Sequence, residues 1–154
     1  MAAVKTVQKG KKVKDFNLKD QNGQDFNLAA CKGKKVLLSF HPLAWTSICA
    51  RQMQDLEKNR KGFDKLNTVA VGMSIDSVPC KAAWAKSIRI KHTKLLADFW
   101  PHGAVAGSLG ILRAEGFSER ANIVVDEAGK VLFIRVYPIK QIPDLAEILA
   151  ALKG

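Results

Sequence analysis

A cysteine at the start of a predicted helix is the residue of this sequence best suited to nucleophilic chemistry. The loop before it reads Phe-His-Pro-Leu-Ala-Trp-Thr-Ser-Ile-Cys over residues 40–49, which places Cys49 in the first helical turn. A helix N-terminus offers unpaired N–H donors and the positive end of the helix dipole, and both favour thiolate over thiol. Taken alone, Cys49 could equally be a small buried apolar residue, as most free cysteines are.

The neighbours of Cys49 favour chemistry over packing. A dithiol exchange site would have a second cysteine three residues earlier, where this chain has Thr46. A threonine hydroxyl can donate to, or accept from, a bound oxygen atom. Together with Pro42, the three residues form the pattern P-x-x-x-T-x-x-C.

This pattern resembles the signature of the peroxiredoxins, the AhpC/TSA superfamily, and the resemblance covers nearly the whole chain. It is closest to the one-cysteine subgroup typified by bacterial alkyl hydroperoxide reductase E. The segments that carry it are DFNLKDQNG, VLLSFHPLAWTSIC, LLADFWPHGAV and ERANIVVDEAGKVLF. The resemblance implies that Cys49 is the peroxidatic cysteine, Thr46 the peroxide-binding hydroxyl and Pro42 the shield of the pocket. It also implies that Arg120 reaches the cysteine from a distant strand, although Arg120 could instead be a surface residue.

The implied reaction needs more than an ionised sulfur. A thiolate attacks the outer peroxide oxygen, becomes sulfenic acid and releases water or an alcohol. An ordinary thiol with a pKa of about 8.5 is roughly 3% ionised at pH 7, so complete ionisation gains at most ~30-fold in rate. The remaining acceleration must come from donors that hold both oxygens while their bond breaks. Thr46, Arg120 and the N–H groups of Ile48 and Cys49 suit that role.

Two residues near the motif depart from the family pattern. His41 stands where relatives usually have an aromatic or other apolar residue, so it either packs or lends a proton. We favour packing and predict that His41→Phe retains most activity; a loss of two orders of magnitude or more in peroxide reduction would contradict this. Gln52 replaces a glutamate that many relatives carry, which puts a charge network at that place in doubt.

The other cysteines bear on how the sulfenic acid is reduced. Cys80 begins the next predicted helix, where some peroxiredoxins place a resolving cysteine and others an inert one. The chain ends at Gly154, directly after its last predicted helix, without the extension that carries a resolving cysteine in typical two-cysteine members. We therefore expect an external reductant, either a small thiol or a thioredoxin- or glutaredoxin-like protein. Cys31 lies in a predicted exposed turn and is treated as incidental.

Hydrophobic patterning predicts an α/β protein of the thioredoxin-like fold, a mixed central sheet flanked by helices with an N-terminal β-hairpin, forming one domain over residues 1–154. The hairpin turns at Asn22-Gly23. Strands are predicted at 34–40, 68–75, 95–98, 122–126 and 130–137, and helices at 47–66, 78–90 and 142–152. In α/β sheets the functional site usually lies where the carboxyl end of a strand leads into a helix. The loop from His41 to Cys49 is therefore the expected site.

Composition narrows the remaining classes of function. The net charge of +11 would suit nucleic acid, but the lysines are scattered and do not alternate with aromatic residues, so a solvated lysine-rich surface is favoured. Three cysteines without CxxC spacing or histidine partners indicate no disulfide framework, metal or other cofactor. No signal peptide or membrane span is evident, which indicates a reducing cytoplasmic location.

The resemblance implies a homodimer, and large apolar residues such as Trp84, Phe99 and Trp100 could serve either the core or an interface. An alternative hypothesis, from a different class of function, is a thioredoxin-fold redox sensor or holdase chaperone with little peroxidase turnover. Thr46 and Arg120 argue against that alternative, because a binding protein does not need a hydroxyl and a cation directed at one thiolate.

Overall fold

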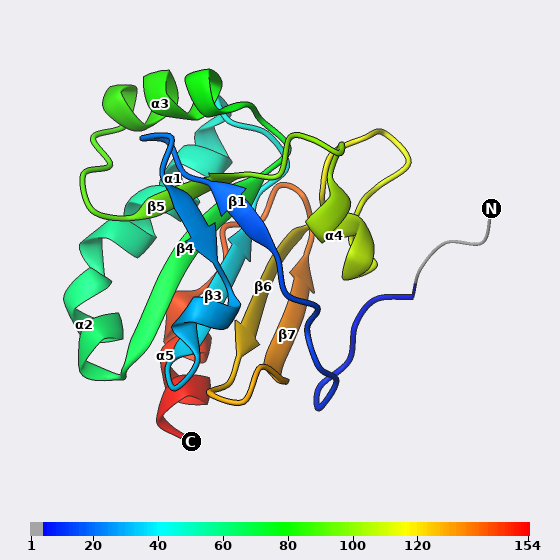
Figure 1. The fold of residues 1–154 in the computed structure, drawn as a ribbon. Helices are drawn as coiled ribbons and strands as arrows, with labels where there is room; N and C mark the ends of the chain where they lie inside the picture. Colours follow the sequence, from blue (N-terminus) through cyan, green and yellow to red (C-terminus); the bar gives the residue numbers. More distant parts are fainter. Residues whose placement is uncertain (1–4) are drawn as a thin grey trace.

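The computed structural model describes residues 5–154, and a five-stranded mixed β-sheet forms its centre (Figure 1). The strands lie in the order β5-β4-β3-β6-β7. Their bounds are β3 (Lys35–Phe40), β4 (Thr68–Ser74), β5 (Lys94–Ala97), β6 (Arg120–Val125) and β7 (Val131–Tyr137). β3, β4 and β5 are parallel, whereas β6 is antiparallel to both of its neighbours. The carboxyl ends of β3, β4, β5 and β7 therefore meet at one end of the sheet.

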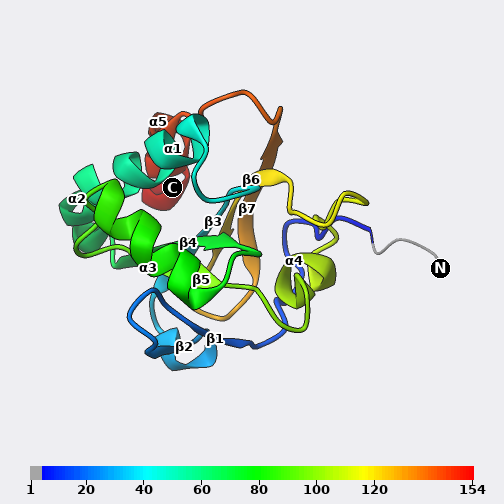
Figure 2. The ribbon, with the colours of Figure 1, turned by 90° about the horizontal axis from the view of Figure 1, so that it is seen from above.

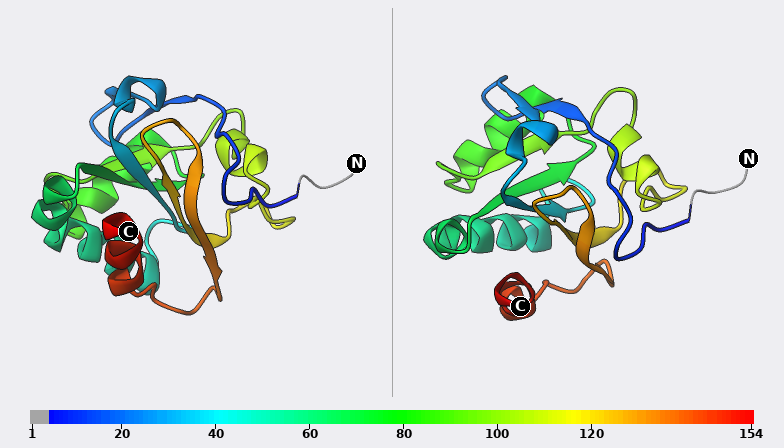
Figure 3. Two further views of the ribbon diagram at one scale, coloured as in Figure 1. Left: turned by 90° about the horizontal axis from the view of Figure 1, so that it is seen from below. Right: turned by 60° about the horizontal axis from the view of Figure 1, so that its bottom comes forward.

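Helices and a hairpin cover the two faces of this sheet. The remaining elements are β1 (Asn17–Lys19), β2 (Asp25–Asn27), the 3-10 turn η1 (Ala29–Cys31), α1 (Ser47–Lys58), α2 (Arg60–Lys65), α3 (Val78–Ser87), α4 (Ala104–Ser108) and α5 (Leu145–Lys153). Figure 2 shows α1, α2 and α5 on one side and the β1–β2 hairpin with α4 on the other. In Figure 3, the N-terminal segment runs beside α4, on the side away from α5.

The alternation of side chains along β3 explains why both faces are apolar. Val36, Leu38 and Phe40 belong to the core under the hairpin and α4, whereas Leu37 belongs to the core under α1 and α5. A strand buried on both faces reads as a continuous apolar run, as this one does.

The predicted N-terminal hairpin is confirmed, but its turn is longer than the Asn22-Gly23 pair alone. The Asp20 carboxylate accepts hydrogen bonds from the N–H groups of Asn22 (2.8 Å) and Gln24 (3.0 Å). Only Gly23 takes a left-handed conformation, with φ of 75°. An aspartate-closed loop thus replaces the expected tight turn.

The prediction of one helix over 47–66 is wrong, because the segment forms α1 and α2 with a break at Asn59. The Asn59 side-chain amide donates to the carbonyl of Asp55 at 2.8 Å. Such a bond competes with the helical backbone ladder and favours a helix end at this place.

The other predicted elements are confirmed with small shifts at their ends. α3 ends at Ser87 rather than Ile90, and α5 begins at Leu145 because Asp144 caps it by accepting from the N–H of Ala146 at 2.9 Å. The short helix α4 was not predicted, since five residues are too few to show helical spacing. Among the described residues, none of the helices combines the length and the apolar composition that a bilayer span requires.

Candidate active site

Cys49 lies in the first turn of α1, directly after the carboxyl end of β3, as predicted. Thr46 is the N-cap of this helix, with extended backbone angles, and the first bond of the ladder runs from the Ala50 N–H to the Thr46 carbonyl at 2.9 Å. The N–H groups of Ile48 and Cys49 precede that bond and have no acceptor inside the helix. The Cys49 side chain is buried, with 1% of the residue exposed. The sulfur therefore lies among free N–H donors in a largely dry environment.

The loop that leads into α1 is held from two directions. The Thr46 hydroxyl donates to the Leu43 carbonyl at 3.0 Å, which leaves its lone pairs able to accept from a bound molecule. The Asp76 carboxylate, from the segment after β4, accepts from the Ala44 N–H at 2.8 Å. Trp45 takes a left-handed φ of 68°, a conformation that costs free energy for a bulky residue. Pro42 is buried at the base of the loop.

Arg120 reaches Cys49 from the first residue of β6. Its Nη1 donates to the Cys49 sulfur at 3.4 Å and to the Gln52 side-chain oxygen at 2.7 Å, and its Nε donates to the Ile139 carbonyl at 2.8 Å. The antiparallel pairing of β6 with β3 brings the two residues together despite their separation in sequence. Since Arg120 is only 2% exposed, its charge acts on the sulfur with little screening by water. The alternative that Arg120 is a surface residue is therefore excluded.

Gln52 links this arginine to the sheet through neutral groups. Its amide nitrogen donates to the Ser39 hydroxyl at 2.8 Å and to the Phe40 carbonyl at 3.1 Å. Ser39 in turn donates to Asn122 at 2.7 Å. The doubt about a charge network is resolved, because the side chain that Arg120 contacts beside Cys49 is the neutral amide of Gln52.

His41 is completely buried and has two kinds of contact. Its ring lies 5.1 Å from the ring of Trp84, so it packs as expected. Its Nε2 also lies 3.2 Å from the Nζ of Lys81, and its Nδ1 has no hydrogen-bond partner within the described part of the chain. Burial, and then the charges of Lys81 and Arg120, hold the pKa of His41 well below its ordinary value.

Sequence reasoning missed Lys81, which is 0% exposed on α3. The available signal was its position three residues before Trp84, because residues at that spacing share one face of a helix. Burial lowers the pKa of Lys81 to about 7, although nearby anionic groups act in the opposite direction. Trp84 is buried core, whereas Phe99 and Trp100 are 52% and 80% exposed, so a core role is excluded for those two.

Cys80 lies in the first turn of α3 and is partly exposed. Its sulfur lies 3.8 Å from the Asp76 carboxylate. Burial, followed by the charge of Asp76, raises the pKa of the Cys80 thiol. A thiol of this kind is a weaker nucleophile at neutral pH than an ordinary cysteine.

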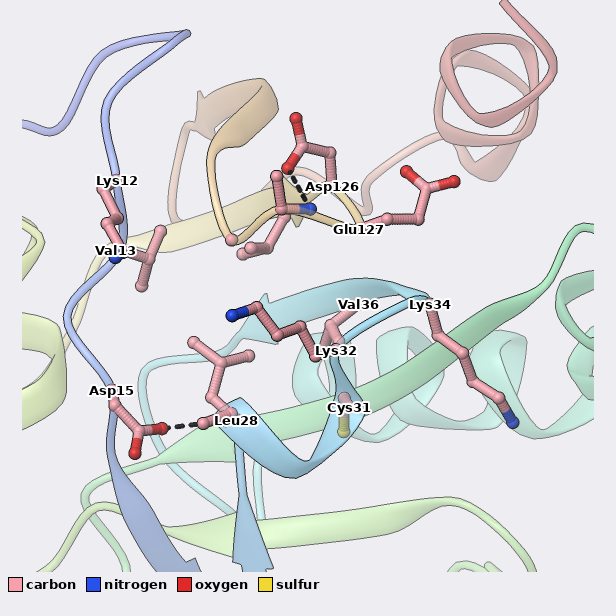
Figure 4. Close-up of a pocket in the computed structure, with 14 residues that line it drawn as sticks. Lys12, Val13, Asp15, Leu28, Cys31, Lys32, Lys34, Val36, Asp126 and Glu127 are labelled. Carbon is pink, nitrogen blue, oxygen red and sulfur yellow. Dashed lines mark hydrogen bonds between the residues drawn. The ribbon is translucent and has the colours of Figure 1, made fainter.

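Cys31 lies far from this site, at the opposite end of the sheet. It lines a hollow of about 190 Å³ between η1 and the β6–β7 turn, with Val13, Leu28 and Val36 also in its wall (Figure 4). Burial raises the pKa of the Cys31 thiol, and the residue is half-buried rather than in an exposed turn. Although this hollow is well formed, it contains none of the residues of the Cys49 motif.

Residues 5–154 contain no group of three or more His, Cys, Asp or Glu side chains arranged to hold a metal ion. His92 contacts Glu57, and His102 contacts the Gly116 carbonyl.

Comparisons with known proteins agree with this geometry. The model of the AhpC/TSA family matches residues 9–134. Alkyl hydroperoxide reductase E of Mycobacterium tuberculosis is 37% identical over 121 residues, covering 77% of this chain and 78% of that protein. A peroxiredoxin of Ignicoccus hospitalis is 35% identical over 130 residues, covering 80% of this chain and 55% of that protein.

The structure also superposes on solved structures of peroxiredoxins. The reduced 2-Cys peroxiredoxin of Plasmodium vivax superposes with a TM-score of 0.85 at 26% identity, covering 94% of this chain and 79% of that chain. Peroxidoxin BcpB of Mycobacterium tuberculosis superposes with a TM-score of 0.82 at 28% identity, covering 94% and 96%.

Proposed function

The chain belongs to the AhpC/TSA family and is a thiol-dependent peroxide reductase with the thioredoxin-like fold of the peroxiredoxins, and from that premise we propose that Cys49 attacks the peroxide. The observation that carries the proposal is the 3.4 Å contact of Arg120 Nη1 with the Cys49 sulfur at a helix N-terminus. An arginine stays charged at any relevant pH, so Arg120 can stabilise negative charge on the peroxide oxygens beside the sulfur as their bond breaks.

The chemical step follows from where the donors lie. The thiolate sulfur forms a bond to the outer peroxide oxygen as the O–O bond breaks, and two electrons pass from sulfur to the leaving oxygen. The leaving oxygen takes up a proton and departs as water or an alcohol, while Cys49 becomes sulfenic acid. Arg120 and the N–H groups of Ile48 and Cys49 are arranged to hold the oxygens as charge moves onto them. Thr46 can bind the peroxide through its free lone pairs, and Pro42 shields the sulfur from water.

An external thiol is the proposed reductant of the sulfenic acid. The raised pKa of the Cys80 thiol disfavours its attack on Cys49, because the thiolate is the attacking species. A small thiol or a thioredoxin- or glutaredoxin-like protein has no such restriction. The three cysteines are all free, which suits a reducing compartment such as the cytoplasm.

A homodimer is proposed through the end of the molecule that carries Cys49. The large apolar side chains exposed in residues 5–154 all belong to segments at this end, where β3, β5 and β7 finish: Trp45, Phe99, Trp100, Val136 and Ile142. Exposed apolar groups that gather in one region favour association with a protein surface.

The deciding experiment oxidises the reduced protein with one equivalent of peroxide and stops the reaction at short times. Wild type and Cys80→Ser are compared by intact mass with and without dimedone, which traps sulfenic acid. Rapid trapping on Cys49 in both proteins is the expected result.

Two other outcomes would change the proposal. A Cys49–Cys80 disulfide in wild type, with sulfenic acid only in Cys80→Ser, would make Cys80 the resolving cysteine. Oxidation no faster than that of a free thiol would favour the redox-sensor or holdase alternative.

A further inference from the structure

A contact between the C-terminal helix and the last strand lies outside the proposed chemistry. Glu147, in the first turn of α5, accepts hydrogen bonds from the Tyr137 hydroxyl and from Nη1 of Arg135, both on β7. Tyr137 is only 2% exposed, and the Arg135 guanidinium lies 5.1 Å from the centre of its ring. Since Tyr137 is the last residue of β7, these bonds hold both ends of the connection over residues 138–144. We call them the Glu147 clamp.

The connection that the Glu147 clamp holds contains an acceptor of Arg120. The Ile139 carbonyl accepts from the Arg120 Nε at 2.8 Å. The Gln141 N–H donates to the Pro138 carbonyl at 3.0 Å, so Ile139 lies inside a turn. Because both ends of the connection are fixed, the clamp limits where the Ile139 carbonyl, and with it the guanidinium, can lie.

A chain of buried side chains also joins the Glu147 clamp to Arg120. The Tyr137 hydroxyl, which donates to Glu147, accepts from the Asn122 amide at 3.3 Å. The Asn122 side-chain oxygen accepts from the Ser39 hydroxyl at 2.7 Å. All members except Glu147 are at most 3% exposed. In order, the chain consists of Arg120, Gln52, Ser39, Asn122, Tyr137 and Glu147.

The hydrogen bonds of this chain all run in one direction. A guanidinium has only donors and a carboxylate has only acceptors, so Arg120 and Glu147 fix the direction at the two ends. Each neutral side chain between them accepts on the Arg120 side and donates on the Glu147 side. The Gln52 oxygen therefore faces Arg120, and the Phe40 carbonyl holds the Gln52 amide nitrogen a second time, at 3.1 Å. A buried network with every member satisfied makes its members rigid.

We propose that Glu147 and Tyr137 are positioning residues of the peroxidase reaction, which hold the Arg120 guanidinium in place. They act through the connection that carries Ile139 and through the buried chain, whereas Arg120 itself contacts the Cys49 sulfur. The inference rests on the proposed function, in which Arg120 stabilises the charge that moves onto the peroxide oxygens.

The first test measures whether Glu147 acts through Arg120. Rate constants of Cys49 oxidation by peroxide are obtained by dimedone trapping for wild type, Glu147→Gln, Arg120→Met and the double variant. We expect Glu147→Gln to lower the rate constant about tenfold, because its amide would direct an N–H at a donor of the clamp and a displaced catalytic group loses rate steeply. In Arg120→Met the same substitution should change the rate constant by less than about twofold, because no guanidinium remains to be positioned.

Two further variants separate the clamp from surface charge. Tyr137→Phe keeps the ring and should lower the rate constant about threefold, since it removes one neutral hydrogen bond while Arg135 still contacts Glu147. The matched control is Glu127→Gln, which loses a surface ion pair with Lys35 at the opposite end of the sheet and should leave the rate constant unchanged.

The second test observes the guanidinium without peroxide. The Nε–H of Arg120 is followed by ¹⁵N NMR and assigned by its absence in Arg120→Met. This N–H is buried and bonded to Ile139, so it should exchange slowly with water in wild type and at least about tenfold faster in Glu147→Gln. Glu127→Gln should not change its exchange.

Two results would overturn the inference. An equal loss of rate on Glu147→Gln with and without Arg120 would assign Glu147 a structural role only. An unchanged rate constant together with unchanged Nε–H exchange would show that the clamp does not hold the guanidinium. If wild type instead reacts with peroxide no faster than a free thiol while the exchange still accelerates in Glu147→Gln, the proposed function fails and the positioning of Arg120 stands.

Discussion

At the scale of single residues, the site consists of the Cys49 sulfur and the Arg120 guanidinium, which donates hydrogen bonds to three acceptors. Arg120 divides its donors among Cys49, Gln52 and the Ile139 carbonyl, so its position does not depend on a substrate. Donors that are already in place when charge moves in a reaction cost no reorganisation at that moment. The planar guanidinium is needed for this arrangement, since a lysine cannot direct separate nitrogens to three acceptors.

Arg120→Lys is therefore expected to lower the second-order rate constant with peroxide by about 100-fold, even though the positive charge is kept. Stopped reactions with dimedone trapping measure this rate. Arg113→Lys is the control, because the Arg113 guanidinium pairs with Glu115 and Glu119 rather than with Cys49 or Gln52. A rate for Arg120→Lys within threefold of wild type would show that charge alone is sufficient.

Lys81 carries a cost in stability that depends on pH. Its pKa is about 7 in the folded protein and 10.5 ordinarily, so the unfolded chain binds the extra proton between these values. The destabilisation is complete below about pH 7 and disappears as pH rises toward 10.5. Lys81→Met should raise the free energy of unfolding by a few kcal/mol, on the order of 2–4, at pH 6. Urea denaturation of wild type and Lys81→Met should show a smaller gain in the free energy of unfolding at pH 9 than at pH 6. A gain that grows with pH would be inconsistent with a lowered pKa of Lys81.

The site residues divide by whether a local pattern marks them. Cys49, Thr46 and Pro42 lie in one short motif, and Arg120 stands at a strand start in a segment typical of the family, so all four could be proposed from sequence. Lys81 shares a helix face with Trp84, but that spacing is a weak signal, because a lysine within a helix is ordinarily a surface residue. Its burial beside His41 becomes evident only in the structure.

At the scale of elements, a carboxylate at the end of α1 holds the connection between α3 and β5. Glu57 accepts from the N–H groups of Lys91 (3.0 Å) and Thr93 (2.8 Å), and from the Thr93 hydroxyl at 2.8 Å. Burial alone would raise the pKa of Glu57, but the hydrogen bonds from Thr93 and Lys91 outweigh it and lower the pKa from 4.5 to about 2. The bonds thus stabilise the folded protein only while Glu57 is ionised.

Glu57→Gln should lower the free energy of unfolding by about 1–2 kcal/mol at pH 7. The glutamine amide would direct an N–H donor at backbone N–H groups that now donate to a carboxylate. The value is kept small because solvent screens the partly exposed Glu57 carboxylate. The folded pKa lies below the unfolded one, so this stability is present above about pH 4.5 and is lost as pH falls toward 2. Urea denaturation at pH 7 and pH 3 measures the difference, with the exposed Asp64→Asn on α2 as control. An undiminished difference at pH 3 would contradict the ionised-acceptor explanation.

Patterning located every strand of the central sheet but not every helix boundary. Continuous apolar runs identify buried strands such as β3 reliably, because both faces of the sheet are covered. The break between α1 and α2 depends on which carbonyl the Asn59 side chain contacts, and that choice is not visible in the spacing of apolar residues. The length of the first turn depends similarly on the side chain of Asp20.

At the scale of the whole molecule, charge and apolar exposure are distributed differently. The lysines that give a net charge of +11 are scattered along the chain, whereas the exposed large apolar side chains belong to the end that carries Cys49. A high net charge disfavours non-specific association, whereas exposed apolar groups that gather in one region favour contact with a protein surface, as the proposed homodimer requires.

Trp100→Glu is accordingly expected to weaken the proposed homodimer at least tenfold, because it would bury a carboxylate in an apolar contact. Sedimentation velocity over a range of concentrations measures the dissociation constant. Lys130→Glu, at the opposite end of the sheet, serves as the charge control. A wild-type protein that stays monomeric at high concentration would exclude the homodimer, and an unchanged dimer in Trp100→Glu would place the contact elsewhere.

The three indoles of the chain differ in their surroundings, with Trp45 and Trp100 exposed and Trp84 only 1% exposed beside the Lys81 ammonium. A protein with Trp45→Phe and Trp100→Phe would retain one fluorophore in a dry environment, emitting at short wavelength. A positive charge near an indole shifts its emission, so the emission wavelength of Trp84 should change when Lys81 gains or loses its proton. The protein thus carries an optical sensor of the charge state of its buried lysine.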